Sequence, residues 1–257
     1  MIQMASSRPS QLWTAPLLVA ALGCGGSGAG ESAGSGDAPA VSEGRSAIPA
    51  SGLTPELLAD SALSRRPGAH EIPLHELGFL YGSPEAPISV VEFSDYGCGY
   101  CRRFQIETFP TLLSDFIEPG RVKWRYVTYL SGAFPKSPSA AMVAECAGEQ
   151  GLFAPVSRLI YEHQRVWRRG ADPVAAVTAL ATEAGADEGE IEACVSERRP
   201  MARLRAGIAA GRRLGVRGTP YFLVEGAPAP GAQPLEWWVR IFTAIEAEIE
   251  SGAGDAS

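Results

Sequence analysis

Part of the chain is apolar enough to form a core. In the first half of that part, short apolar runs alternate with stretches whose apolar residues recur at helical spacing. Residues 88–93 are an apolar run rich in β-branched and aromatic side chains, which predicts a buried strand, and residues 121–130 predict a second. Between them, residues 98–117 carry apolar side chains at helical spacing, and Pro110 is expected to kink this helix. The pattern therefore predicts a strand, a helix and a second strand in that order.

The second half of the chain has a different character. Residues 137–214 are rich in Ala, Glu and Arg at helical spacing, which predicts four or five short helices and no strand. A strand is expected at 221–225, a second short strand between Gly226 and Gly231, and a final helix at 234–249. That helix carries an apolar stripe, which we expect to face the core, with a dimer face as the alternative. The fold class is therefore α/β with an all-helical block.

The N-terminal region has the pattern of an export signal. Residues 1–24 contain an apolar run that is too short to span a membrane and that ends at Cys24. The residues before Cys24 resemble a bacterial lipoprotein signal, in which the cysteine is acylated; the alternative is an ordinary secretory signal. Residues 25–46 are mostly Gly, Ser and Ala and predict a flexible tether. Residues 54–63 predict a short helix, and residues 47–257 are expected to form one domain.

Composition and charge narrow the classes of function. The 257 residues are 46% hydrophobic and 20% charged, which is typical of a globular protein. The formal net charge of −7 argues against binding to nucleic acid. No uninterrupted apolar run reaches the ~18 residues that a membrane-spanning helix requires, so a multi-span membrane protein is not expected.

Two of the five cysteines lie where the first predicted strand gives way to a helix. Cys98 and Cys101 are separated by two residues, so they can form a disulfide within one helical turn. A helix N-terminus stabilises a thiolate, which is the reactive form of cysteine. We expect Cys98 to be the exposed nucleophile and Cys101 the buried resolving thiol. The alternatives are an inert structural disulfide or half of a zinc site.

A metal site has little support in the sequence. The chain has three histidines, none of which has a partner at the spacing of a paired ligand: His70, His75 and His163. No phosphate-binding loop or nucleophile elbow is present. We therefore expect no metal and no cofactor.

Two segments resemble DsbA-like proteins of the thioredoxin fold. The first is Val90–Cys101, which contains the dithiol, and the second is Gly215–Val224, which contains Gly-Thr-Pro. The helical residues between them resemble that family's insertion into the thioredoxin core. The resemblance covers roughly residues 70–250 and implies a thioredoxin fold with an inserted all-helical subdomain at about 137–214.

The resemblance also implies roles for individual residues. Pro220 would be a cis-proline that faces the dithiol, and the backbone of Thr219 would bind an extended substrate segment. Glu92 would be a buried acid that exchanges protons with the resolving thiol; the alternative is a structural strand residue. Gly99 and Tyr100 would complete the substrate-binding surface. This dipeptide departs from the Pro-His of strongly oxidising DsbA enzymes and resembles that of the isomerase DsbC.

The two remaining cysteines lie 48 positions apart in the helical block. In an oxidising compartment we expect Cys146 and Cys194 to form a structural disulfide, and the alternative is two separate buried thiols. Such a loop would stabilise the domain by roughly 4 kcal/mol. With Cys24 lipidated, this pairing accounts for the odd number of cysteines.

Together these features predict a protein thiol-disulfide oxidoreductase in the cell envelope. We expect it to be anchored through Cys24 on the periplasmic side, with a soluble periplasmic or secreted protein as the alternative. Its partners would be exported cysteine-containing proteins and a membrane redox protein, with oxidation favoured over reduction or isomerisation. Two other functions remain open: a non-catalytic thioredoxin-fold module that binds peptides, and a metal chaperone that uses Cys98 and Cys101.

Overall fold

The structure is a computed structural model that describes residues 73–254. Four expectations concern residues outside this range: the signal at 1–24, the acylation of Cys24, the tether at 25–46 and the helix at 54–63.

A five-stranded mixed sheet forms the centre of the molecule, in the order β1-β3-β2-β4-β5. Its strands are β1 (Phe79–Tyr81), β2 (Ile88–Ser94), β3 (Val122–Thr128), β4 (Tyr221–Val224) and β5 (Ala227–Pro230). The neighbours β2 and β3 are parallel, and the other three pairs are antiparallel. Nearly all of β2 is buried, as its continuous apolar run predicts. The edge strand β1 has three residues, follows the 3-10 turn Leu74–Glu76 and is not among the strands predicted from the sequence.

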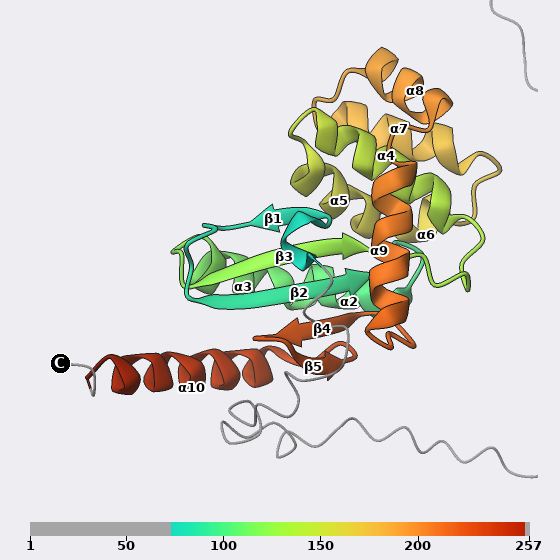
Figure 1. Ribbon diagram of the computed structural model, residues 1–257. Coiled ribbons are helices and arrows are strands. Elements are labelled where there is room, and N and C mark those ends of the chain that lie inside the picture. Colours follow the sequence, from blue (N-terminus) through green and yellow to red (C-terminus); the bar gives the residue numbers. More distant parts are fainter. Residues whose placement is uncertain (1–72, 255–257) are drawn as a thin grey trace, which may run out of the picture. The chain divides into compact units, whose positions relative to one another are not determined.

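Helices cover both faces of the sheet (Figure 1). One face packs against α2 (Gly99–Glu107), α3 (Phe109–Leu112), a π-helical turn (Leu113–Ile117) and α10 (Leu235–Gly254). The apolar stripe of α10 is buried in this layer, so it faces the core: Trp237, Trp238, Ile241, Phe242 and Ile245. The opposite face packs against α9 (Met201–Arg213).

The helix expected at 98–117 is interrupted rather than kinked at its proline. Thr108 separates α2 from α3, and Pro110 lies in the first turn of α3. Proline has no N–H to bond the carbonyl of Ile106, four residues earlier, and its ring crowds that carbonyl. The break therefore falls two residues before Pro110.

The all-helical block contains five helices, and a sixth connects it to the sheet. The five are α4 (Ser137–Glu149), α5 (Phe153–Glu162), α6 (Gln164–Trp167), α7 (Pro173–Glu183) and α8 (Glu188–Glu197). The sixth, α9, contributes Leu204 to the core of the block. Its C-terminal half lies against β3, where a Cβ at Gly207 would be 2.7 Å from the Thr128 carbonyl oxygen. The expected four or five helices are thus six, and α9 is shared between the block and the sheet.

No helix within residues 73–254 combines the length and the apolar character that a membrane span requires.

Candidate active site

The dithiol lies at the N-terminus of α2, directly after the central strand β2. The Cys98 Sγ atom caps this helix by accepting a hydrogen bond from the Cys101 backbone N–H at 3.3 Å. An N-cap side chain pairs with one of the backbone donors that a helix leaves free in its first turn. Cys98 and Cys101 are free thiols in this structure. The Cys98 sulfur therefore lies at the electropositive N-terminus of α2.

A cis peptide bond faces the dithiol from the start of β4. The bond joins Thr219 and Pro220, and the Cys98 Sγ atom lies 3.2 Å from the Thr219 carbonyl oxygen, to which it donates a hydrogen bond when it is protonated. Strand pairing brings these distant segments together, because Phe93 of β2 is paired with Tyr221 of β4. The two segments that resemble the DsbA-like family thus meet at one site.

The two sulfurs have opposite acid strengths. A hydrogen bond from the Cys101 thiol, with help from backbone N–H groups, lowers the pKa of Cys98 to about 6. Burial is the main reason that the pKa of Cys101 lies well above its usual value, and the negative charge on Cys98 raises it further. At neutral pH, Cys98 is therefore a thiolate and Cys101 a protonated thiol, which is the asymmetry that thiol-disulfide exchange uses.

Cys98 is less exposed than the sequence analysis expected. The accessible fraction of the Cys98 surface is 4%, and that of Cys101 is 0%. Pairing with Thr219 and packing against the helical block cover most of the Cys98 side chain. The expectation that Cys98 is exposed is therefore wrong. Cys98 is nevertheless more accessible than Cys101. Tyr100, between the two cysteines, is 63% exposed.

Glu92 is fully buried on β2 and is hydrogen-bonded on both carboxylate oxygens. The Gln105 side-chain amide lies 2.9 Å from each oxygen, and the Trp124 indole N–H donates to one of them at 2.9 Å. Burial nevertheless raises the pKa of Glu92 to about 7. Ser94 opposes this effect at Glu92 and also acts to lower the pKa of Cys101, so its hydroxyl interacts with both the acid and the resolving thiol.

The raised pKa of Glu92 predicts a pH-dependent stability. The folded protein holds this proton up to about pH 7, whereas the unfolded chain releases it near 4.5, so stability falls as pH rises between these values. We expect this decline in the free energy of unfolding to be smaller by up to about 3 kcal/mol in the Glu92→Gln variant than in the wild type. Urea unfolding of the oxidised protein from pH 5 to pH 8 measures it, because neither active-site thiol then titrates.

The exposed Glu248→Gln variant is the matched control and should reproduce the wild-type curve. A Glu92→Gln curve parallel to that of the wild type would show that Glu92 is already ionised in the folded protein.

Two residues that position the dithiol were not found from the sequence. The Asp95 carboxylate is buried and accepts hydrogen bonds from Gly97, Ser131 and Ser137, so it fixes the loop between β2 and α2. The Gln164 amide of α6 donates to the carbonyls of Tyr96 and Cys98, at 2.6 and 2.8 Å. A polar residue directly after a buried strand is the signal for Asp95. Gln164 has no such signal, because only the fold brings α6 to the dithiol.

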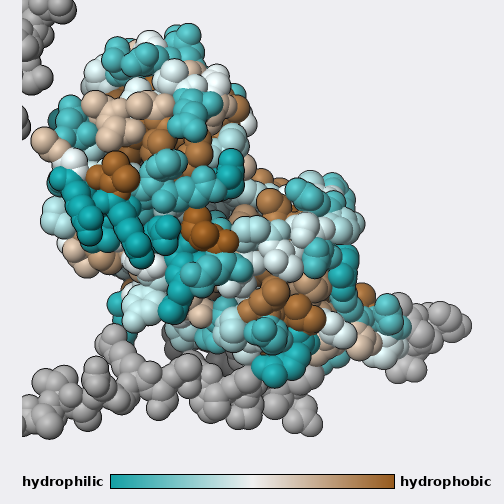
Figure 2. Space-filling view, turned by 180° about the vertical axis from the view of Figure 1, so that it is seen from behind, coloured by the Kyte–Doolittle hydropathy of each residue, from teal (hydrophilic) through white to brown (hydrophobic). Residues whose placement is uncertain are grey.

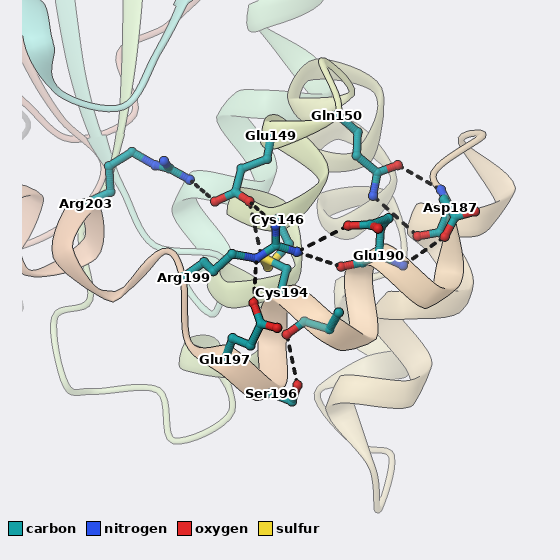
Figure 3. A network of polar contacts seen from close by, with 11 residues as sticks. Cys146, Glu149, Gln150, Asp187, Glu190, Cys194, Ser196, Glu197, Arg199 and Arg203 are labelled. Atoms are coloured by element: carbon teal, nitrogen blue, oxygen red, sulfur yellow. Dashed lines mark hydrogen bonds and ion pairs between the residues drawn. A yellow bond between two sulfur atoms is a disulfide. The ribbon is translucent and has the colours of Figure 1, made fainter.

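Cys146 and Cys194 form a disulfide that joins α4 to α8. Figure 3 shows charged side chains beside it: Arg199 pairs with Glu149, Glu190 and Glu197, and Arg203 also reaches Glu149. Both cysteines are buried in the hydrophobic cluster of the helical block, to which Cys98 and Cys101 also belong, but they are not bonded to that pair. Within residues 73–254, no group of three or more His, Cys, Asp or Glu side chains is arranged to hold a metal ion.

Comparison with known proteins supports the fold and identifies the family. The family model described as thioredoxin matches residues 75–243, which is well over half of the chain. The chain belongs to the thioredoxin family. Among solved structures, this thioredoxin-family chain is similar to DsbA of Chlamydia trachomatis, with a TM-score of 0.60 and 17% sequence identity. The match covers 67% of this chain and 93% of the DsbA chain. The prediction of a DsbA-like thioredoxin fold with a helical insertion is therefore confirmed.

Curated relatives match shorter stretches of sequence. Disulfide bond formation protein D of Bacillus subtilis is 43% identical over 51 residues, which is 20% of this chain and 23% of that protein. The Na(+)/H(+) antiporter NhaA 1 of Salinispora arenicola is 31% identical over 155 residues, 60% of this chain and 22% of that protein. The matched stretches thus cover about a quarter of these relatives' length.

Proposed function

We propose that this thioredoxin-family protein is a protein thiol-disulfide oxidoreductase that oxidises cysteine pairs in exported polypeptides. One observation carries the proposal: the Cys98 sulfur caps α2 and lies 3.2 Å from the Thr219 carbonyl oxygen beside a cis-proline. An electropositive helix end stabilises the Cys98 thiolate, and stabilising the reduced form makes a dithiol pair more oxidising. The solved relative named DsbA and the curated relative named for disulfide bond formation support this function.

The reaction starts from the oxidised Cys98–Cys101 pair. A substrate thiolate attacks the Cys98 sulfur, so a mixed disulfide forms and the bond to Cys101 breaks. Cys101 leaves as a thiolate and takes up a proton, because its pKa lies well above the usual range. A second substrate thiolate then attacks the substrate sulfur of the mixed disulfide and releases the Cys98 thiolate. The substrate loses two electrons as its disulfide forms, and the enzyme pair gains them.

Glu92 supplies the proton that Cys101 takes up, through the hydroxyl of Ser94. With a pKa of about 7 the carboxyl is available both to give and to take a proton at neutral pH. A membrane redox partner then removes the two electrons from the enzyme pair. The Cys101 proton returns to Glu92 in that step, so Glu92 is not consumed over a cycle.

The substrate lies in an extended conformation against the cis-proline loop in this scheme. The backbone of Thr219 and Pro220 bonds the segment that carries the substrate cysteine. Gly99 and Tyr100 form the other side of the substrate site, since both are exposed at the start of α2. The protein acts on the periplasmic side of the cell envelope, where acylated Cys24 anchors it to the membrane. The apolar run that ends at Cys24 supports this location.

Reduction or isomerisation is the second candidate direction. It is favoured by the Gly99-Tyr100 dipeptide, which places no histidine between the cysteines. A histidine cation there would add to the stability of the Cys98 thiolate, so its absence lowers the oxidising power of the pair.

The reduction potential of the Cys98–Cys101 pair distinguishes the two directions. We expect equilibration with glutathione to give a value nearer the roughly −120 mV of DsbA than the roughly −270 mV of thioredoxin. The paired variant Cys146→Ala, Cys194→Ala is the control, because its only remaining pair within residues 73–254 is the active-site dithiol. A value near that of thioredoxin would contradict the oxidase and favour the reductase.

A further inference from the structure

Four segments that are separate in the sequence surround the dithiol. Residues 97–103 contain it, and residues 215–221 contain the cis-proline loop that faces it. Residues 163–171 are held to it by Gln164, whose amide donates to the Cys98 carbonyl. Residues 131–137 contribute Phe134, which packs so closely on the loop that a Cβ at Gly97 would be 2.3 Å from the Phe134 Cβ.

These four segments are strongly basic in an acidic protein. They contain seven of the chain's 22 Lys and Arg residues and none of its 29 Asp and Glu residues. The seven side chains, called the basic rim here, are Arg102, Arg103, Lys136, Arg165, Arg168, Arg169 and Arg217. Five of them are exposed, and Arg102 and Lys136 are partly buried. The net charge of −7 for the whole chain does not reveal this local concentration of positive charge.

No ion pair neutralises the basic rim within the part of the chain that the structure describes. Among residues 73–254, no rim side chain forms an ion pair, whereas Arg121, Arg158, Arg199 and Arg203 all pair with glutamates elsewhere. Three carboxylates close to the four segments in sequence are already engaged. Asp95 is buried in hydrogen bonds of its own loop, Glu162 pairs with Arg158, and Asp172 caps α7. The rim therefore presents positive charge to whatever approaches the dithiol.

Apolar and aromatic side chains lie among these cations. Tyr100 and Val166 are 63% and 68% exposed, the highest values among the large hydrophobic side chains of the described residues. The Arg103 guanidinium lies 5.1 Å from the centre of the Tyr100 ring, and that of Arg168 lies 5.4 Å from the Phe134 ring. The face that Figure 2 presents has hydrophobic patches between hydrophilic side chains.

We propose that the basic rim selects acidic polypeptide segments as substrates of the Cys98–Cys101 pair. The inference rests on the proposed function and adds the chemical class of its substrate: an extended segment with Asp or Glu on both sides of its cysteine. Carboxylates near the cysteine pair with the guanidinium groups, while apolar neighbours pack on Tyr100 and Val166. A polypeptide fits better than an anionic lipid surface, because the cations belong to the four segments around the reactive sulfur, one of which carries the Thr219 backbone that would bond an extended chain.

The rim also raises the rate of encounter. A cluster of one sign beside a reactive group increases the local concentration of oppositely charged partners, and salt screens this effect. The acidic remainder of the protein repels such partners from other surfaces. Acidic substrates are thereby directed to the dithiol.

Two synthetic dithiol peptides test the proposal, identical except that four flanking residues are Glu in one and Lys in the other. We expect the oxidised protein to react at least roughly tenfold faster with the Glu peptide at about 20 mM salt, and the ratio to approach one at about 0.5 M. Stopped-flow tryptophan fluorescence follows the reaction. Equal rates at low salt, or a preference for the Lys peptide, would overturn the proposal.

Paired charge variants locate the effect. Arg165→Glu with Arg169→Glu should lower the peptide preference at least about threefold, and the milder Arg165→Gln with Arg169→Gln should lower it in the same direction. The control is Arg205→Glu with Arg240→Glu, which makes the same change in net charge on α9 and α10. A control pair as damaging as the rim pair would show that net charge alone acts, and would refute a local site.

Two further measurements distinguish a peptide-selecting rim from an inactive dithiol and from a membrane-binding surface. Oxidation of dithiothreitol, a small neutral dithiol, should be nearly equal in the wild type and in the rim variants. If the wild type oxidises neither dithiothreitol nor either peptide, the proposed function fails; if it oxidises both peptides equally, only the acidic preference fails. Binding to phosphatidylglycerol vesicles that is lost in the rim variants, with equal peptide rates, would assign the rim to a membrane surface and overturn the proposal.

Discussion

Replacement of Cys98 by serine is expected to lower the rate of substrate oxidation at least about a thousandfold, because the variant loses the attacked sulfur. Serine is among the best N-cap residues, so its hydroxyl should still accept the Cys101 backbone N–H and keep α2 in place. The loss should therefore appear in the reaction of a reduced peptide with the protein and not in its unfolding curve.

The matched variant is Cys101→Ser, which keeps the nucleophile and removes the resolving thiol. It should form a mixed disulfide with an oxidised peptide through Cys98 and release it only slowly, and mass spectrometry detects the adduct. Alkylation of Cys98 by iodoacetamide in reduced wild-type protein should rise with pH around a midpoint near 6 and then level off, because the thiolate is the reacting form. A Cys98→Ser protein with near-normal oxidation, or an alkylation midpoint above about 8, would refute the assignment of the nucleophile.

Loss of the Cys146–Cys194 disulfide is expected to destabilise the protein by about 4 kcal/mol, since it closes a loop of 48 residues. For a protein of this size that corresponds to a fall in Tm of roughly 8–16 °C. The loop contains α5, α6 and α7, so the disulfide limits the freedom of most of the helical block in the unfolded chain. Thermal and urea unfolding of the variant Cys146→Ala, Cys194→Ala measure the effect, with the active-site pair oxidised throughout.

The single variants Cys146→Ala and Cys194→Ala are the controls. Each should cost about as much as the double variant, because either change breaks the same bond. A double variant that loses less than about 1 kcal/mol would show that the helical block is held by its packing and its Arg199 and Arg203 ion pairs instead. Oxidation of small substrates should be unchanged, since the disulfide involves neither Cys98 nor Cys101.

Gln164 shows how the helical block takes part in the active site. It lies 66 residues after Cys98, yet its amide bonds two carbonyls of the loop that carries the dithiol. The basic rim likewise draws three of its arginines from the segment that begins beside Gln164. The block therefore contributes both to the geometry of the dithiol and to the charge around it.

Local sequence determined much of this protein. The apolar run of β2, the dithiol at a helix start and the apolar stripe of α10 follow from patterns within single segments, because each depends on the periodicity of its own backbone. Tertiary structure alone decided other features. The edge strand β1 is too short to show a pattern, and it forms because β3 offers a free edge. Burial of Cys98 and the position of Gln164 depend on contacts between segments far apart in the chain, and no local pattern encodes such contacts.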